Sequence, residues 1–193
     1  MTILILGLVL FLGTHSVRIV AEGWRTATIA RVGPGVWKGV YSLVALAGFV
    51  AIVWGYGLAR QAPVVLWTPP LAMRHVASLL TLIAFVMLFA AYVPRNGIKA
   101  RLKHPMVLSV KVWAFAHLLA NGTLADVLLF GGFLVWAVLD FRAARQRDRA
   151  AGTVYPAGTL AGTAATVAVG VAAWALFAFW LHAAWIGVAP FGR

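Results

Sequence analysis

The chain has 193 residues, of which 63% are hydrophobic and only 10% are charged, and its mean hydropathy is +0.95. Soluble domains average roughly a quarter charged residues, so this composition is typical of a chain that lies in lipid. The absence of cysteine excludes disulfides, thiolate metal sites and cysteine nucleophiles. Any metal ligand must therefore come from histidine, a carboxylate, methionine or tyrosine.

Sixteen basic and four acidic residues give a formal net charge of +12 and a pI near 11.6. In a soluble chain such a charge would indicate nucleic-acid binding. Here the basic residues lie between apolar runs, where they set membrane topology against anionic lipid. We therefore expect the lipid bilayer as a partner and expect no nucleic-acid binding.

Six apolar segments follow one another, at residues 2–20, 37–58, 71–93, 104–120, 123–139 and 157–188. A helix needs about 20 apolar residues to cross a bilayer core. The long unbroken apolar runs exclude a membrane β-barrel, whose strands alternate in polarity. The sequence thus predicts an all-α fold, a polytopic membrane helix bundle of about six transmembrane helices in a single domain, 1–193. No basic residue precedes the first segment, so we expect a retained span and not a cleaved signal peptide.

Local patterns predict several of the span boundaries. A Gly-Pro-Gly sequence at 33–35 is expected to break any helix before the second span. Thr123 and Asp126 have capping-box spacing at the start of the fifth span. Gly158 and Gly162 open the sixth segment with the small-residue spacing that lets membrane helices approach closely.

The distribution of lysine and arginine predicts the orientation in the membrane. The first, third and fifth loops are basic, whereas the turn between the fourth and fifth spans has no lysine or arginine. By the positive-inside rule, the three basic loops are cytoplasmic. Both termini are then expected outside.

The stretch 103–121 is apolar enough for a membrane yet carries His104, Lys111 and His117. Ionisable groups inside a bilayer are costly and usually mark a site, and imidazole is the readiest metal ligand in a chain without cysteine. His117 shares one helical face with Trp113 and Asn121, which offers a ligand, a flat wall and a polar end. The ordinary alternatives are a helix boundary at His104 and a lysine that extends along its stem toward water.

Three further polar residues are candidates for the same chemistry. His15 lies late in the first span with Arg18 one turn on, which suits a cofactor that bears carboxylates. His75 opens the third span. The alternatives are a packing histidine at His15, an interfacial residue at His75 and a topology anchor at Arg18. His182 is expected to be a packing residue, and the four scattered acidic residues give no support for paired-carboxylate hydrolysis.

Several blocks of this sequence resemble the NnrU family. The match covers nearly the whole chain up to about residue 145, and its most specific part is the block from His-Pro at 104–105 to Asn-Gly at 121–122. The blocks that carry the resemblance are Gly-Thr-His-Ser at 13–16, Gly-Tyr-Gly-Leu-Ala-Arg at 55–60, 104–106 through 116–122, Leu-Leu-Phe-Gly at 128–131 and Trp-Ala-Val-Leu-Asp at 136–140.

The resemblance implies a multi-pass protein of the bacterial inner (cytoplasmic) membrane, associated with nitrite and nitric oxide metabolism in denitrification. The family is similar to the plant zeta-carotene isomerase, a membrane enzyme that uses haem b. Matched onto this sequence, the proposed iron ligands of that relative are His15 and His117. The remaining family histidines correspond to His75 and His104. Arg60, Arg18 or Lys111 could pair with the haem propionates.

Two ligand pairs stay open at this point. By the predicted topology, His15 lies toward the cytoplasm and His117 toward the outside, and their depths differ by roughly 10 Å at 1.5 Å rise per residue. Depth therefore favours His75 with His117, whereas the resemblance favours His15 with His117.

The resemblance implies support of nitrogen-oxide reduction by redox chemistry, haem handling or nitric oxide sensing. A carotenoid isomerase activity follows by analogy only. A second hypothesis is an S-adenosylmethionine-dependent membrane methyltransferase, because the His-Pro to Asn block also resembles those enzymes. They carry a glutamate pair and a tyrosine motif after this block, whereas residues 142–193 contain no glutamate and Tyr155 is isolated. A third is a cofactor-free assembly factor for nitric oxide or nitrite reductase components.

Overall fold

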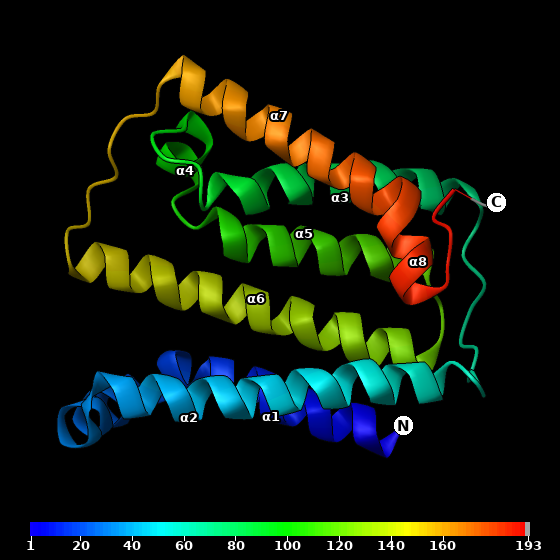
Figure 1. Cartoon of the computed structure of the whole chain (residues 1–193), viewed down its shortest axis with the longest axis horizontal. Coiled ribbons are helices and arrows are strands. Elements are labelled where there is room, and N and C mark those ends of the chain that lie inside the picture. Colours follow the sequence, from blue (N-terminus) through cyan, green and yellow to red (C-terminus); the bar gives the residue numbers. More distant parts are fainter. Residues whose placement is uncertain (192–193) are drawn as a thin grey trace. The chain divides into compact units, whose positions relative to one another are not determined.

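A computed structural model describes residues 1–191 of the chain, and the described part is helical with no strand (Figure 1). Two isolated β-bridges, Val65 with Thr123 and Asn96 with Thr159, join loops. The predicted all-α fold is confirmed. The helices are α1 (Thr2–Val20), α2 (Glu22–Ala59), α3 (Ala72–Ala90), α4 (Gly97–Leu102), α5 (Pro105–Ala120), α6 (Leu124–Ala150), α7 (Leu160–Leu176), a π-helical segment (Phe177–Leu181) and α8 (His182–Ile186).

Among the described residues, five helices are long and apolar enough to cross a membrane. They are α1, α2, α3, α6 and the run Leu160–Ile186, which α7, the π-helical segment and α8 form together. The expected fourth span is α5, an apolar helix of 16 residues. The chain is therefore a membrane helix bundle.

The chain forms two compact units. Unit one contains Met1–Trp67 and Gly122–Asp140, and unit two contains Thr68–Asn121 and Phe141–Arg193. Helix α6 contributes residues 124–140 to the first unit and 141–150 to the second.

In unit one, α1 and α2 pack against each other through glycine. A Cβ atom on Gly7 would lie 2.6 Å from the backbone nitrogen of Ile52, and one on Gly48 would lie 2.7 Å from that of Phe11. Gly55 meets the backbone of Leu4 in the same way. Small residues let membrane helices approach at backbone distance, where van der Waals packing holds them together.

Helix α2 begins earlier than the sequence predicts. Residues 22–32, expected as a loop, are helical. The break expected at 33–35 is present, since Gly33 adopts φ 82° and ψ 156° immediately before Pro34. Glycine alone enters this backbone region without a clash at Cβ. The residue before a proline is also driven away from helical angles. The second span thus starts after a kink.

The start of α6 is fixed by the predicted capping box. The Asp126 carboxylate accepts hydrogen bonds from the Thr123 backbone N–H at 2.9 Å and from its hydroxyl at 2.6 Å. The Tyr56 hydroxyl donates to the same carboxylate at 2.6 Å, which ties α6 to α2 within unit one. Helix α6 continues to Ala150, although its apolar span was expected to end at 139. The arginine-rich segment after it is helical because arginine and alanine favour helices.

In unit two, α3 packs against α5 and α7. A Cβ atom on Gly170 of α7 would lie 2.7 Å from the Cα of Val86. The close contact expected at Gly158 and Gly162 is present, because both lie against the backbone of 94–97.

Hydrogen bonds between loops join them in two groups. Leu66 and Trp67 N–H donate to the Gly122 carbonyl at 2.8 and 3.1 Å, so the connector before α3 meets the turn after α5. A second bond joins the loop after α3 to the loop before α7, because the Thr159 N–H donates to the Arg95 carbonyl at 2.7 Å. The second and fourth loops therefore lie together, and so do the third and fifth. This is the arrangement that α5 produces if it crosses back alongside α3.

Candidate functional site

His15 lies in α1 with its ring orientation fixed by the backbone. Its Nδ1 is 2.7 Å from the Phe11 carbonyl oxygen one turn earlier. A carbonyl can only accept, so Nδ1–H is the donor and the neutral ring carries its lone pair on Nε2. That tautomer is the usual state of a metal-binding histidine, whose other nitrogen is held by a carbonyl or carboxylate.

Aromatic rings surround the His15 imidazole in unit one. The Phe11 ring stacks on it with centroids 4.2 Å apart, and Tyr41 and Trp136 meet it edge-on at 5.4 and 6.0 Å. Three elements, α1, α2 and α6, supply these rings. The half-buried imidazole thus has a dry, aromatic wall on several sides.

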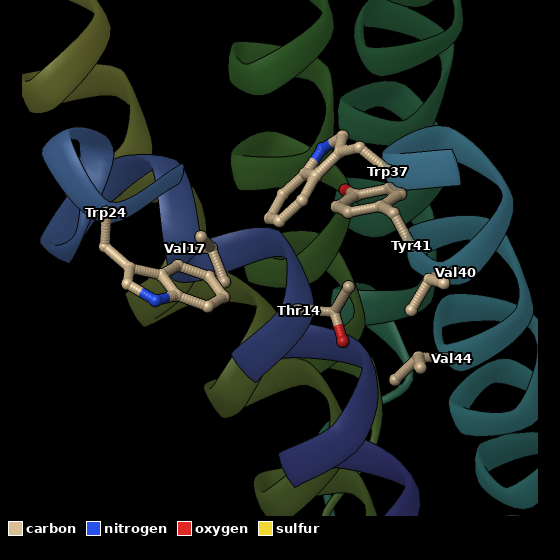
Figure 2. A pocket seen from close by; sticks show the side chains of 7 residues that line it. All are labelled: Thr14, Val17, Trp24, Trp37, Val40, Tyr41 and Val44. Carbon is tan, nitrogen blue, oxygen red and sulfur yellow. The ribbon is translucent and has the colours of Figure 1, made fainter. Parts of the chain in front are cut away.

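Beside this cluster, α1 and the kinked α2 form an apolar cleft of about 150 Å³. Figure 2 shows Thr14 and Val17 of α1 facing the α2 side chains that complete it. Tyr41 belongs both to the cleft and to the rings around His15. Sites for drug-sized ligands have roughly 300–1,000 Å³, so this cleft is smaller than a typical ligand site. The α2 residues that line the cleft are Trp24, Trp37, Val40, Tyr41 and Val44.

His117 occupies an equivalent local setting in α5 of unit two. Its Nδ1 lies 2.8 Å from the Trp113 carbonyl oxygen, so Nδ1–H donates and Nε2 holds the lone pair of the neutral ring. The Trp113 indole is tilted against the imidazole with centroids 5.1 Å apart. The Asn121 amide donates to the His117 carbonyl at 2.8 Å and ends the helix. The predicted shared face of these three residues is present.

The other predicted cofactor residues are distributed over both units. In unit one, Arg18 is exposed and lies 3.8 Å from Glu22, and Arg60 is the exposed residue that ends α2. In unit two, His75 is exposed in the first turn of α3. Lys111 is half-buried in α5, and its side-chain amine has no ion pair or hydrogen bond within residues 1–191.

His104 lies immediately before α5 and contacts a carboxylate. Its Nε2 is 2.8 Å from an Asp148 oxygen at the end of α6, and the Tyr155 hydroxyl lies 3.1 Å from the same oxygen. The His104 side chain makes no capping bond to α5. These three residues, which we call the His-Asp-Tyr cluster, join the start of α5, the end of α6 and the following loop.

The environment of Tyr155 changes its acidity. Partial burial raises the pKa of the Tyr155 hydroxyl above its ordinary value, and the hydrogen bond to Asp148 and the charge of that carboxylate raise it further. The nearby charge of Arg145 acts in the opposite direction. The phenol therefore stays protonated and can donate to Asp148 across the neutral pH range.

Sequence patterns did not predict the partners of His104 or the aromatic rings around His15. Asp148 and Tyr155 are 44 and 51 residues from His104, and no local spacing connects them. The contact between Phe11 and His15 could have been predicted from the sequence, since Phe11 precedes His15 by one helical turn. In residues 1–191, no cluster of three or more histidine or acidic residues could hold a metal ion.

A family model described as NnrU protein matches residues 3–190. No curated protein and no solved structure matches the chain. Because the matched region spans almost the entire sequence, the chain belongs to the NnrU family.

Proposed function

We propose that this protein of the NnrU family is a haem b protein of the bacterial inner membrane, with His15 and His117 as imidazole ligands. Its role is to support nitrite and nitric oxide metabolism by redox chemistry, nitric oxide sensing or haem handling. The family membership supports the second part, and the local chemistry of the two histidines supports the first.

The observation that carries the proposal is the same at both histidines. In each, Nδ1–H donates to the carbonyl four residues earlier, which orients the ring and makes Nε2 the nitrogen that carries the lone pair of the neutral imidazole, the form that binds metals. In a chain without cysteine, imidazole is the strongest ligand type present for haem iron. His182 also donates from Nδ1 to a carbonyl, that of Val188, so the bond alone does not select a ligand. His15 and His117 are the two that match the proposed iron ligands of the related zeta-carotene isomerase.

When bound, haem b would supply one-electron redox chemistry and an iron that binds small ligands. The surrounding side chains would tune it. Phe11, Tyr41 and Trp136 exclude water around the His15 imidazole, and Trp113 covers one side of His117. A low local dielectric strengthens the effect of nearby charges on an iron centre. Lys111, half-buried in α5, is the residue we propose to pair with a propionate.

Visible spectroscopy of the protein expressed with ample haem tests the proposal. We expect a Soret band and a pyridine haemochrome typical of haem b. His15→Ala and His117→Ala should each abolish or strongly shift the spectrum, because an imidazole that would hold the haem is lost. His182→Ala is the matched control, since it removes an imidazole with the same Nδ1 contact, and it should leave the spectrum unchanged.

Two results would contradict the proposal. A purified, folded protein without a Soret band would remove haem binding. Retention of the wild-type spectrum in both the His15 and the His117 variants would reassign the ligands, and His75 would be the next candidate. In a denitrifying host that lacks its own copy, full complementation of nitrite reduction by both variants would favour an assembly factor without a cofactor.

A further inference from the structure

A small cavity in unit two lies next to the most basic loop of the chain. Its volume is about 110 Å³, and it is bounded by the segment that precedes and begins α4 and by the loop after α6. The residues of its wall that bear on its chemistry are Pro94, Arg95, Asn96, Lys99, Tyr155 and Pro156.

The hydrogen bonds of the buried Asn96 side chain hold one wall of this cavity in place. Asn96 is only 2% exposed, and its side-chain amide donates to the carbonyls of Ala90 and Val93 at 2.9 and 2.6 Å. Its amide oxygen accepts from the Lys99 N–H at 2.7 Å and thereby caps α4. One buried side chain therefore fixes the end of α3 and the start of α4 in a single arrangement.

The start of α7 holds the same segment from the other side. The Thr159 N–H donates to the Arg95 carbonyl at 2.7 Å, and the Gly97 N–H donates to the Thr163 hydroxyl at 2.8 Å. A Cβ atom on Gly162 would lie 2.5 Å from the Arg95 carbonyl oxygen. The backbone that carries Arg95 is thus fixed by packing on both sides.

Two basic residues of this loop have an unfavourable backbone conformation. Arg95 has φ 52° and Lys103 has φ 67°, and they are the only positive-φ residues other than glycine in residues 1–191. Glycine or asparagine would occupy such positions more easily. Strained backbone angles that the surrounding structure enforces tend to occur at functional sites. In this loop, each of the two strained positions carries a basic side chain.

The charges around the cavity are almost all positive. Arg95, Lys99, Arg101 and Lys103 form no ion pair within residues 1–191. Lys99 Nζ donates to the Ala91 carbonyl at 2.9 Å, and Lys103 lies 5.9 Å from the centroid of the Tyr155 ring. The carboxylate that contacts the cavity residue Tyr155 is Asp148, which is already bound by His104 and Tyr155 and faces the charge of Arg145.

We propose that this cavity binds the phosphate of an anionic phospholipid, with Arg95 and Lys99 as its cationic contacts. The guanidinium offers a planar fork that matches phosphate oxygens, and the ammonium adds a point charge. Pro94 and Pro156 supply apolar walls, against which the glycerol end of the lipid would pack.

The expected location of the loop at the membrane surface makes the bilayer the source of the ligand. The third and fifth loops are basic and are joined by the Asn96–Thr159 bridge, so the positive-inside rule places the cavity at the cytoplasmic membrane surface. The cytoplasmic leaflet carries anionic lipid, and basic pockets between membrane helices on this side bind such headgroups. This proposal does not depend on haem binding.

Native mass spectrometry of the purified protein in detergent, titrated with phosphatidylglycerol or phosphatidylcholine, tests the proposal. We expect one saturable phosphatidylglycerol molecule and much weaker phosphatidylcholine binding. The double variant Arg95→Gln/Lys99→Gln should weaken phosphatidylglycerol binding about tenfold or more, since each basic residue near anionic lipid contributes about a fivefold change. The matched control is Arg142→Gln/Arg149→Gln, which removes the same charge from exposed positions of α6 and should change binding less than about twofold.

If the double variant does not fold, Arg95→Lys keeps the charge but loses the planar fork, and a severalfold weaker binding is expected. Equal affinity for the two lipids would overturn the proposal, and so would an equal loss in the control variant. Inorganic phosphate is a separate arm of the titration. Displacement of the lipid by phosphate at the same concentration would show that the cavity takes the free anion.

Discussion

The histidines of this chain differ in which ring nitrogen is engaged. His15 and His117 use Nδ1 on a backbone carbonyl, whereas His104 uses Nε2 on the Asp148 carboxylate. In a neutral ring the first arrangement places the lone pair on Nε2, whereas in the second arrangement Nε2 itself contacts the carboxylate. A metal at His104 Nε2 would have to displace a 2.8 Å contact to a carboxylate. Local chemistry thus separates His104 from the two proposed ligands.

His104→Ala should therefore leave the haem spectrum unchanged and lower stability. The change removes the central contact of the His-Asp-Tyr cluster and leaves Asp148 with Tyr155 alone. A hydrogen bond to a charged group contributes roughly 1.5–3 kcal/mol, and partial exposure reduces that figure. Visible spectra and thermal unfolding in detergent check both parts. Loss of the Soret band with unchanged stability would contradict this assignment.

Tyr155 should give the protein a pH-dependent stability at the alkaline end. Because the pKa of its hydroxyl is raised in the folded state, the folded protein retains a proton that the unfolded chain loses near pH 10. The stabilisation is then complete below about pH 10 and is lost as pH rises through the folded-state pKa. Tyr155→Phe should lower the unfolding midpoint at pH 7 but not at the highest pH.

Thermal unfolding of wild type and Tyr155→Phe from pH 7 to 11 measures that difference. Tyr92→Phe is the control, because Tyr92 is 67% exposed and its hydroxyl has no hydrogen bond within residues 1–191. A constant difference between wild type and Tyr155→Phe over the whole range would contradict the expected linkage.

At the scale of helices, the α1–α2 pair depends on the absence of side chains at its contact. Gly55 has the backbone of Leu4 where its Cβ would lie, whereas Gly57, two residues on in the same helix, has nothing within 4 Å. The two glycines therefore separate the effect of crowding from that of helix propensity.

Gly55→Ala should destabilise the protein by about 1–3 kcal/mol, because an extra carbon in a close-packed contact forces the helices apart. Gly57→Ala should be neutral or stabilise by up to about 1 kcal/mol, since alanine favours helix more than glycine. Reversible unfolding in mixed micelles measures both. Equal effects of the two changes would show that helix propensity, and not the α1–α2 contact, decides stability.

Helix ends show where local sequence rules succeed. The break at Gly33 and the capping box at Thr123 and Asp126 follow from the chemistry of a few adjacent residues, and both are present. The helices at 22–32 and 141–150 were expected as loops because they are polar. Polarity reports contact with water, and a polar segment rich in alanine and arginine can still be helical.

For the whole molecule, hydropathy was sufficient to predict an all-α membrane bundle, because the bilayer requires every backbone group to be bonded within its own segment. The side-chain contacts around His15 and His104 could not be predicted from hydropathy. The rings around His15 come from three helices, and the carboxylate at His104 comes from a helix end 44 residues away. Those contacts depend on tertiary packing, which no single-segment pattern encodes.

Membrane orientation can be tested with single cysteines, since the native chain has none. Gln61→Cys lies just after α2 and Gln146→Cys lies in the basic end of α6, and both positions are exposed. With both termini outside, a membrane-impermeant maleimide should label position 61 in intact cells and position 146 only after permeabilisation. The reverse pattern would invert the predicted topology.

The 16 residues of α5 have a consequence for the lipid that surrounds the protein. At 1.5 Å per residue this helix is about 24 Å long, against roughly 30 Å for a typical hydrocarbon core. The hydrophobic mismatch must be relieved by local thinning of the bilayer or by its flanking residues. Short-chain lipids should therefore suit this protein better than long-chain ones, and bilayer thickness becomes a variable that acts on the helix carrying His117.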